Sequence, residues 1–525
     1  MSSNVARERE LKLVGEPEVL RKLVDHVPGR AKVEAPTVVE RLVSDYYDTS
    51  DLRLARRRLA LRVRHDGRRR VQTLKAAALP GSIVADRPEW EVEIARDRPD
   101  LAAFASPEVV DETGLILPHD LRKQFSVDVE RARTRLAWAG MDGSTSRIEV
   151  AVDHGRVVAG RQSVPVAEVE LELLDGKPRA LFELAAALRR RLPLRLGASD
   201  KAIRGYRLLG GVPPGAVRAA KLDSGGASTV EALLAQSLRG CVSHAVANES
   251  AAIDGSDIEG IHQLRVALRR LRSALSVFRP AVPEQSRQRW AAEARWLLGK
   301  LGPCRDLDVF VVELLDPLRR HPQLGGLLTE LETVAQVRRK VAQVAAAAAI
   351  RSRRAGDLLL ELACWVETAG WRNGATALQL ELQQSPPRIL AERLLARRAK
   401  RVRKTGRGFA SLPAEQRHDV RIALKKLRYG LEFFAPVFGS AESRRYHQVV
   451  TALQDNLGRH NDIEVARRMV DDLVLAAPVE RRVAAARGGG MLVGWYAQAA
   501  AALEPETVEL WQKLRALEPF WKDEP

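Results

Sequence analysis

The sequence predicts two domains of different fold class, an α+β domain followed by an all-α domain. Residues 1 to about 210 contain short runs in which apolar and charged residues alternate, which is the pattern of β-strands with two unlike faces. From about residue 228 to 525, apolar residues recur with helical spacing almost throughout. The Gly- and Pro-rich stretch of residues 211–227 separates the two patterns, and we expect it to be an interdomain linker.

The chain is strongly basic. It has 525 residues, a formal net charge of +18 and an isoelectric point near 10.2. A surplus of this size predicts a polyanionic partner, which could be nucleic acid, inorganic polyphosphate or an anionic membrane. The length is too great for a single hydrophobic core and agrees with two or more domains.

The sequence shows no sign of export or membrane insertion. The N-terminus is charged from Arg7 onward without an apolar signal segment, and the Ala-rich run of residues 344–350 is far too short to span a bilayer. The three cysteines, Cys241, Cys304 and Cys364, are too widely spaced for a disulfide framework or a zinc site. We therefore expect a protein of the reducing cytoplasm with no membrane partner.

Several strand-like runs of the first domain carry charge on one face. Side chains alternate between the faces of a strand, so residues two apart point the same way. The charged sets expected from this rule are Arg62 and Arg64; Glu91 and Glu93; Arg131, Arg133 and Arg135; and Glu168, Glu170 and Glu172, with Lys75 and Asp153 single on further runs. The dipeptides at residues 142–143 and 154–155 are typical of hairpin turns.

The run Glu8-Arg9-Glu10-Leu11-Lys12 adds another charged face, with two carboxylates and one ammonium group. Such faces fit either a sheet with one solvated face or a closed barrel with a charged lumen. The barrel is favoured because a wet sheet face normally also carries Thr, Ser and Gln. A lumen with both charges would hold phosphoryl oxygens through Arg and Lys, and Mg²⁺ or Mn²⁺ through Glu and Asp. The sequence has no Gly-rich phosphate loop of the P-loop enzymes.

In their order and spacing these residues resemble the motif set of CYTH domains, the triphosphate tunnel metalloenzymes that include class IV adenylyl cyclases and thiamine triphosphatases. The likeness covers about residues 4–208. It implies an eight-stranded antiparallel β tunnel that binds a triphosphate together with one or two divalent ions, Mg²⁺ or Mn²⁺. The residues that carry it are Glu8, Glu10, Lys12, Arg62, Arg64, Lys75, Glu91, Arg133, Asp153, Glu168, Glu170 and Lys201.

The resemblance also implies roles for these residues. The substrate phosphates would be held by Lys12, Arg62, Arg64, Lys75, Arg133 and Lys201. The metal ligands would be Glu8, Glu10, Glu168 and Glu170, and the catalytic set would be Glu8, Glu10, Lys12, Glu91 and Asp153. This chain departs from the family in having Asp200, where Ser is usual, before Lys201. Arg131 competes with Arg133 because both face the same way.

The second domain contains an internal repeat. Residues 262–272 align with 418–428, and residues 301–308 align with 457–464. The two alignments share one offset, since 418 − 262 = 156 and 457 − 301 = 156. Equal offsets over separate segments predict two similar helical bundles related by a pseudo-twofold axis.

Each copy of the repeat carries a basic stripe on a predicted helix. In the first copy no acidic residue occurs from His262 to Arg279. An amphipathic helix with an ordinary basic surface would explain one stripe, whereas two matching stripes favour a shared anion-binding surface. The candidate residues for binding polyphosphate are His262, Arg265, Arg269, Arg270, Arg272, His418, Arg421, Lys425, Lys426 and Arg428.

This pattern, H-x-x-R-V-x-x-R-R-L-R with its second copy, resembles CHAD domains, helical domains that often follow CYTH domains. The likeness covers about residues 226–520 and implies two pseudo-symmetric four-helix bundles around a basic groove that binds inorganic polyphosphate. His262 and His418 would either bind phosphate or have a structural role inside the bundle. Asp306 and Asp462 stand at matched positions, where orienting an arginine is favoured over binding a metal.

The sequence therefore predicts a cytoplasmic inorganic triphosphatase that hydrolyses triphosphate with a divalent metal in its tunnel. Its helical domain is expected to bind polyphosphate and to associate with polyphosphate granules. The alternatives are a nucleoside or thiamine triphosphatase or a cyclase, and a polyphosphate-binding protein without significant turnover. Nucleic acid is expected to bind only non-specifically, through its phosphate charge.

Overall fold

The computed structural model of the chain describes residues 7–23, 27–66, 69–76, 82–114, 116–198, 200–210, 215–220 and 227–521. The chain forms two compact units. The first consists of Met1–Arg218, Val242–Ala251 and Arg351–Gly370, and the second of Ala219–Cys241, Ala252–Ile350 and Trp371–Pro525. The domain boundary at residues 211–227 stays a prediction, because most of that segment lies outside the described residues.

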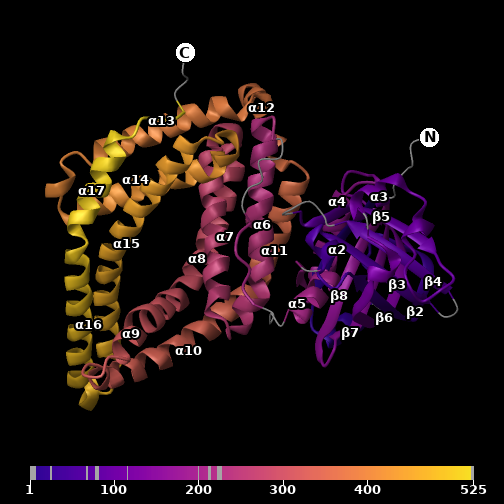
Figure 1. Cartoon of the computed structure of the whole chain (residues 1–525), viewed down its shortest axis with the longest axis horizontal. Helices are drawn as coiled ribbons and strands as arrows, with labels where there is room; N and C mark the ends of the chain where they lie inside the picture. The colour runs from indigo at the N-terminus through magenta and orange to yellow at the C-terminus, as the bar shows by residue number, and fades with distance from the viewer. Residues whose placement is uncertain are drawn as a thin grey trace. The chain divides into compact units, whose positions relative to one another are not determined.

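The first unit is built on a closed antiparallel β-barrel (Figure 1). Eight strands follow the order β5-β4-β3-β2-β6-β7-β8-β1, and pairing of β1 with β5 closes the circle. This confirms the eight-stranded antiparallel tunnel expected from the resemblance. The strands are β1 Arg7–Val14, β2 Ala31–Asp48, β3 Leu59–Asp66, β4 Arg69–Ala76, β5 Val84–Glu93, β6 Arg122–Ala139, β7 Thr145–Ala159, β8 Gln162–Asp175 and the short β9 Arg195–Leu196, which pairs with β1.

One of the predicted hairpin turns is wrong. Residues 154–155 lie inside β7, and the chain turns at Gly160, whose φ of 58° suits a hairpin. Gly155 has a different reason: a Cβ atom there would lie 2.1 Å from the carbonyl oxygen of Asp128 on β6, so the neighbouring strand leaves no room for a side chain. The turn at residues 142–143 does join β6 to β7.

The apolar faces of the strands are covered by helices on the outside of the barrel. Leu61 and Val63 of β3 pack in a buried cluster with Leu54 of α2 (Arg53–Arg56) and Val109 of α3 (Pro107–Thr113). Helix α1 (Pro17–Arg21) contacts β7 and β8, and α4 (Arg179–Arg189) contacts β1 and β8. Because one face of each strand packs under this layer, the alternate, charged face points into the lumen.

Helix α5 (Lys201–Leu209) fills one end of the lumen. On β6, Phe125, Val127 and Val129 share a face with Arg131, so the lumen side of this strand changes from apolar to charged. The apolar part packs against α5, where the ring of Tyr206 meets Phe125 edge-on with centroids 5.1 Å apart. The charged part of the lumen remains for a ligand.

After residue 230, every regular element that the structure describes is a helix, which confirms the predicted all-α fold. No helix in the described ranges carries an apolar stretch long enough to cross a lipid bilayer. The helices are α6 Val230–Asp254, α7 Ile258–Val277, α8 Glu284–Asp308, α9 Asp316–Arg319, α10 Thr329–Arg351, α11 Arg353–Glu367, α12 Ala377–Gln384, α13 Pro387–Thr405, α14 Ala414–Phe434, α15 Ala441–Ala476, α16 Arg482–Ala502 and α17 Glu504–Ala516.

The predicted repeat is visible in the helix boundaries. Helix α7 begins at Ile258 and α14 at Ala414, and the 3₁₀ turns that follow them begin at Arg279 and Ala435. Both pairs are 156 residues apart (414 − 258 and 435 − 279). In each copy the next long helix packs beside this region, as Figure 1 shows for α7 with α8, and α7 also contacts α14. The two basic helices of the repeat therefore meet.

The close contact between α5 and β6 generates a stability prediction. A Cβ atom added at Gly205 would lie 2.2 Å from Cε2 of Phe125, so either the helix or the ring must move. We expect Gly205→Ala to lower the free energy of unfolding of the barrel by about 1–3 kcal/mol, measured by urea denaturation. Leu209→Ala, in the exposed last turn of the same helix, is the control and should change it by less than about 0.5 kcal/mol. A Gly205→Ala protein as stable as the wild type would contradict this packing.

Candidate active site

A single large cavity occupies the charged part of the lumen. Its volume is about 1180 Å³, and all eight long strands and α5 contribute to its wall. Of the twelve residues that carry the CYTH resemblance, ten line this cavity: Glu8, Glu10, Lys12, Arg62, Arg64, Lys75, Glu91, Arg133, Glu170 and Lys201. The other two, Asp153 and Glu168, are completely buried behind the wall. The structure thus brings the charged strand faces together in one enclosed space.

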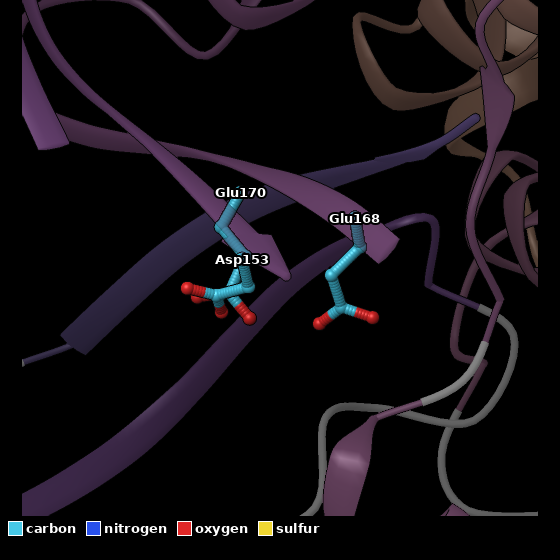
Figure 2. A group of neighbouring side chains, drawn as sticks. All are labelled: Asp153, Glu168 and Glu170. Carbon is cyan, nitrogen blue, oxygen red and sulfur yellow. The ribbon is translucent and has the colours of Figure 1, made fainter. Parts of the chain in front are cut away.

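Three carboxylates from neighbouring strands form an acidic cluster, drawn in Figure 2. Asp153 of β7 pairs directly with Glu168 of β8 in the sheet register, and Glu170 follows two residues later on the same face. One oxygen from each carboxylate lies within 4.8 Å of the others. Oxygen atoms in such a group suit a hard divalent cation, so this donor set fits Mg²⁺ or Mn²⁺.

Two lysines neutralise the acidic cluster. The Lys201 ammonium lies 2.6 Å from Asp153, 2.5 Å from Glu168 and 2.8 Å from Glu170. Lys12 of β1 lies 2.7 Å from Glu170. Burial would raise the pKa of Glu170, but Lys12 and Lys201 hold it well below its usual range. Glu170 is therefore ionised, and Lys201, at the first turn of α5, lines the cavity beside it.

The structure does not bring Glu8 and Glu10 into this cluster. Glu8 lies 2.8 Å from Lys75 and 3.0 Å from Nε of Arg87. Burial would raise the pKa of Glu8, yet Lys75 and Arg87 lower it to about 2. The neighbouring Glu10 behaves in the opposite way, since burial and the negative charge of Glu170 raise its pKa to about 7. Two carboxylates on one strand face thus differ in charge state near neutral pH.

Arg131 and Arg133 have different environments although they share a strand face. Arg131 makes a two-pronged hydrogen bond to Asp153, at 2.7 and 2.6 Å, and lies 2.6 Å from Glu170. Arg133 has a side chain that is 41% exposed and lies 3.5 Å from Glu40. Arg131 is thus fixed by the acidic cluster, whereas Arg133 is the freer of the two to meet a ligand.

The remaining predicted residues lie along the wall formed by β3, β4 and β5. Nη2 of Arg62 lies 3.9 Å from Glu89, and Nη2 of Arg64 lies 3.6 Å from Glu91. The Nε atom of Arg62 is buried and has no hydrogen-bond acceptor among the described residues. Because a buried donor without a partner is costly, this group favours a bound oxyanion or water.

Sequence reasoning missed Arg87 and Glu89 of β5, and it treated Asp200 only as a departure from the family. Arg87 and Glu89 share a face with Glu91, so extending the strand alternation backward from Glu91 would have found both. Asp200 has a structural explanation. Its carboxylate lies 3.3 Å from Lys12 and pairs with Arg87, which holds the start of α5 against β1 and β5.

A second group of cations lies in the helical unit, where α7 and α14 meet. Burial lowers the pKa of Lys425 to about 8, and the nearby Arg269, Arg421, Arg428 and Arg272 lower it further in that order. Two of these arginines come from α7 and two from α14, so both copies of the repeat contribute. Like charges held together in a partly buried space indicate a binding surface for an anion.

The other predicted residues of this surface lie in varied surroundings. Arg265 donates through Nη1 to the carbonyl oxygen of Leu298 at 2.9 Å. Burial raises the pKa of Asp306, although Arg265 and Arg305 act to lower it, so Asp306 faces arginines, as expected from its position. The side chain of Asp462 lies outside the described residues. The guanidinium of Arg270 lies over the ring of Phe433, and Lys426 is exposed.

The two repeat histidines are not equivalent. His262 is half-buried, and burial followed by the charge of Arg305 lowers its pKa, which favours the neutral ring. His418, at the corresponding position of α14, is exposed. The environments of the two rings therefore differ, while the arginine and lysine positions of the two stripes meet near Lys425.

The fold and the site define a closed antiparallel tunnel with a charged interior, followed by a duplicated helical unit with a basic surface. Comparison with protein families gives each part its name. The CYTH domain family matches residues 6–206, and the CHAD domain family matches residues 236–471. The chain therefore belongs to the proteins in which a CYTH domain is followed by a CHAD domain.

Among curated proteins, the chain is similar to the inorganic triphosphatase of Haemophilus influenzae, with 29% identity over 210 residues. The match covers 40% of this chain and 56% of that protein, so the chain spans about half of the relative's length. A solved CHAD domain from the plant Ricinus communis is 29% identical and covers 57% of this chain and 96% of its own, with a TM-score of 0.48. A protein from Hippeastrum studied as an adenylyl cyclase, with a dominant triphosphatase activity, is 19% identical and covers 38% of this chain and 95% of its own, with a TM-score of 0.26.

The position of Lys201 predicts how the tunnel responds to a divalent ion. Its ammonium and a metal ion would compete for the same carboxylates, so we expect Lys201→Met to bind Mn²⁺ about tenfold more tightly than the wild type. The metal-free variant should also unfold at a lower temperature, because three buried carboxylates lose a counter-charge. The unfolding temperature without metal measures the loss of stability, and the rise in that temperature on addition of Mn²⁺ measures the affinity.

The matched control is Lys177→Met, which removes an exposed lysine that pairs with Asp142 on the outside of the barrel. This variant should show the wild-type response to Mn²⁺. If Mn²⁺ raised the unfolding temperature of Lys201→Met and of the wild type equally, Lys201 would not compete with the metal for the acidic cluster.

Proposed function

We propose that the tunnel hydrolyses inorganic triphosphate with the help of a divalent metal ion, and that the helical unit binds inorganic polyphosphate. The observation that carries the first part is the shared cavity of the barrel. It combines a three-carboxylate cluster with a wall of arginines and lysines, which are the two kinds of group that phosphoryl transfer requires. The similarity of the barrel to part of a curated inorganic triphosphatase supports the same reaction.

Asp153, Glu168 and Glu170 are the residues that we propose to hold the metal, with Glu8 and Glu10 as the further carboxylates expected from the family resemblance. A bound divalent ion would supply Lewis-acid polarisation of the phosphoryl oxygens. Mg²⁺ and Mn²⁺ both suit carboxylate ligands, and either is expected to support the reaction.

The cations of the wall would position the substrate. Lys75, Arg62 and Arg64 approach the cavity from β3 and β4, Arg133 approaches from β6, and Lys12 and Lys201 lie beside the acidic cluster. A triphosphate bound among them would have its charge neutralised from several sides and its terminal phosphorus held near the carboxylates. Closure of one end of the lumen by α5 would exclude bulk water from that region.

An organic triphosphate is the second candidate substrate, because the cavity is not uniformly charged. Trp90 and Phe104 also line it, and the Nε1 atom of Trp90 is buried without an acceptor among the described residues. An aromatic wall of this kind could hold a nucleobase or a thiamine ring. The comparison of substrates below separates the two candidates.

Polyphosphate binding by the helical unit is supported by the crowding of cations near Lys425. The Nε atoms of Arg269 and Arg421 are buried and have no acceptor among the described residues. Phosphate oxygens would satisfy these donors and relieve the repulsion among the five cations. The expected association with polyphosphate granules would follow from the same surface.

The tunnel proposal predicts a metal-dependent release of phosphate. Purified full-length protein should release phosphate from tripolyphosphate with Mg²⁺ or Mn²⁺, and EDTA should abolish the activity. Glu170→Gln should reduce kcat by about 100-fold or more, because it removes a charge from the acidic cluster without changing its shape. ATP and thiamine triphosphate, assayed in parallel, should be hydrolysed more slowly.

The control is Glu130→Gln, an exposed position on β6, which should retain wild-type activity. Wild-type turnover by Glu170→Gln would remove the acidic cluster from the reaction. A preference for ATP or thiamine triphosphate would instead favour the organic substrate.

The lowered pKa of Lys425 predicts how polyphosphate binding depends on pH. With a pKa of about 8 in the free protein, Lys425 loses its charge as the pH rises from 7 to 9, so affinity should fall by up to about tenfold. Lys425→Arg keeps its proton over this range and should flatten the profile. Lys426→Arg, at the exposed neighbouring position, should leave the wild-type profile unchanged. Calorimetric titration with short-chain polyphosphate at pH 7, 8 and 9 tests this, and parallel profiles for all three proteins would contradict it.

A further inference from the structure

Helix α13 carries a further basic stripe, outside the two repeated stripes of α7 and α14. Arg393, Arg397, Lys400, Arg401 and Lys404 follow one another at helical spacing. At 100° per residue they fall within a sector of about 100° and extend over about 16 Å of the helix. All five are exposed, while Leu390, Leu394 and Val402 on the other side of the helix are buried. The stripe is therefore a solvent-facing surface of the helical unit.

This stripe has no compensating negative charge. The sequence contains no Asp or Glu from Arg393 to Ala414. Within the part of the chain that the structure describes, none of the five side chains makes a hydrogen bond or an ion pair. Like charges one turn apart destabilise a helix slightly, and an ordinary solvated helix reduces this cost by mixing signs. The arrangement indicates a surface that is completed by an external polyanion.

In the first copy of the repeat, the face of α6 that corresponds to the stripe is buried. Shifting by 156 residues pairs the buried Leu234 and Leu238 of α6 with Leu390 and Leu394 of α13. The same shift places Ser237, Cys241, His244, Ala245 and Asn248 at the positions of the basic stripe, and all five are buried. His244 and Asn248 bond to the carbonyl oxygen of Val217, each at 2.9 Å. This face is thus covered by the chain in the first copy and is exposed and basic in the second.

Contacts made by Arg398 connect α13 to the two repeat helices. Its Nη1 donates to the carbonyl oxygen of Lys426 on α14, and its Nη2 lies 3.5 Å from Oγ of Ser276 on α7. The preceding residue, Arg397, lines a hollow of about 320 Å³ together with Arg279, which follows α7. Arg279 also pairs with Glu284, which lines the same hollow, so the link from α7 and α14 to α13 is one of packing and hydrogen bonds.

We propose that the stripe on α13 is a second polyphosphate-binding surface, which takes up the part of a long chain that extends beyond the cations near Lys425. The inference rests on the proposed polyphosphate binding of the helical unit. Because one polymer would engage two linked surfaces, binding at the second becomes intramolecular and strengthens with chain length. A short chain fills only the first surface, so α13 contributes nothing to its affinity.

The side chains of the stripe favour polyphosphate over the other polyanions. The stripe contains no aromatic residue on which a nucleobase could stack, so it offers recognition of phosphate charge alone. It also presents no large apolar side chain, which a protein partner would need at the centre of a stable interface. A regular chain of phosphates matches a straight row of cations and requires neither.

The test compares chain lengths and surfaces in the full-length protein. The α13 variant combines Arg393→Gln, Lys400→Gln and Lys404→Gln, which keep a helix-forming side chain and remove three charges. For polyphosphate of several hundred residues we expect its Kd to rise by about tenfold or more. The slope of log Kd against log salt should fall by about two. For a chain of about ten phosphates, its Kd should stay within about twofold of the wild type.

Two further variants separate this proposal from the proposed function. The control, Arg338→Gln, Lys340→Gln and Arg487→Gln, removes the same charge from exposed positions elsewhere and should bind both chain lengths as the wild type does. The variant Arg269→Ser with Lys425→Ser should weaken binding of both lengths.

If the α13 variant binds long chains as tightly as the wild type while the Arg269 and Lys425 variant does not, the second surface is refuted and the proposed function stands. If the wild type binds neither length, the proposed function fails and this inference fails with it. If single-stranded RNA of equal charge loses affinity for the α13 variant while polyphosphate does not, the stripe is a nucleic-acid surface and the proposal is overturned.

Discussion

The ion cluster of three carboxylates with Lys12, Lys201, Arg131 and Arg204 inside the barrel is the interaction on which the tunnel depends. Charges buried in a protein interior are tolerated only when they are paired and hydrogen-bonded. The closed barrel makes this possible, because each of its eight long strands is paired with two neighbours and the strand alternation turns the charged faces that form the site inward. Lys201 reaches the cluster only because α5 fills the apolar end of the lumen. The charge pairing inside the tunnel therefore depends on both the closure of the barrel and the packing of α5.

The tunnel and the region near Lys425 differ in the partners of their cations. In the tunnel nearly every cation faces a carboxylate, so the charges of the site largely balance one another. Near Lys425 the cations face one another, and of the five only Arg428 has a carboxylate partner, Glu432, among the described residues. The first arrangement suits positioning for chemistry, whereas the second suits holding a polymer. This difference supports a division of labour between the domains.

The internal repeat shows how duplication allows one copy to change. Helices α7 and α14 begin at equivalent residues, and the leucines that pack α6 and α13 correspond. The outer faces have diverged, since α6 uses its equivalent face for packing within the chain and α13 presents cations to solvent. A buried face restricts side-chain size and polarity, while an exposed face is free to gain charge. The divergence thus occurs where packing no longer limits the sequence.

The sequence by itself predicted the fold classes, the repeat and the charged strand faces, because strand alternation and helical periodicity fix which side chains share a face. The family resemblance added the remaining cavity residue, Lys201 of α5. The sequence could not determine which charged residues pair, since that depends on distances between strands far apart in the chain. Only the tertiary structure shows that Arg87 pairs with Glu8 and that Lys201 lies among three carboxylates. The same holds for Gly155, where β6 lies too close to leave room for a side chain. A face is a local property of one strand, whereas an ion pair or a close approach exists only after the barrel has closed.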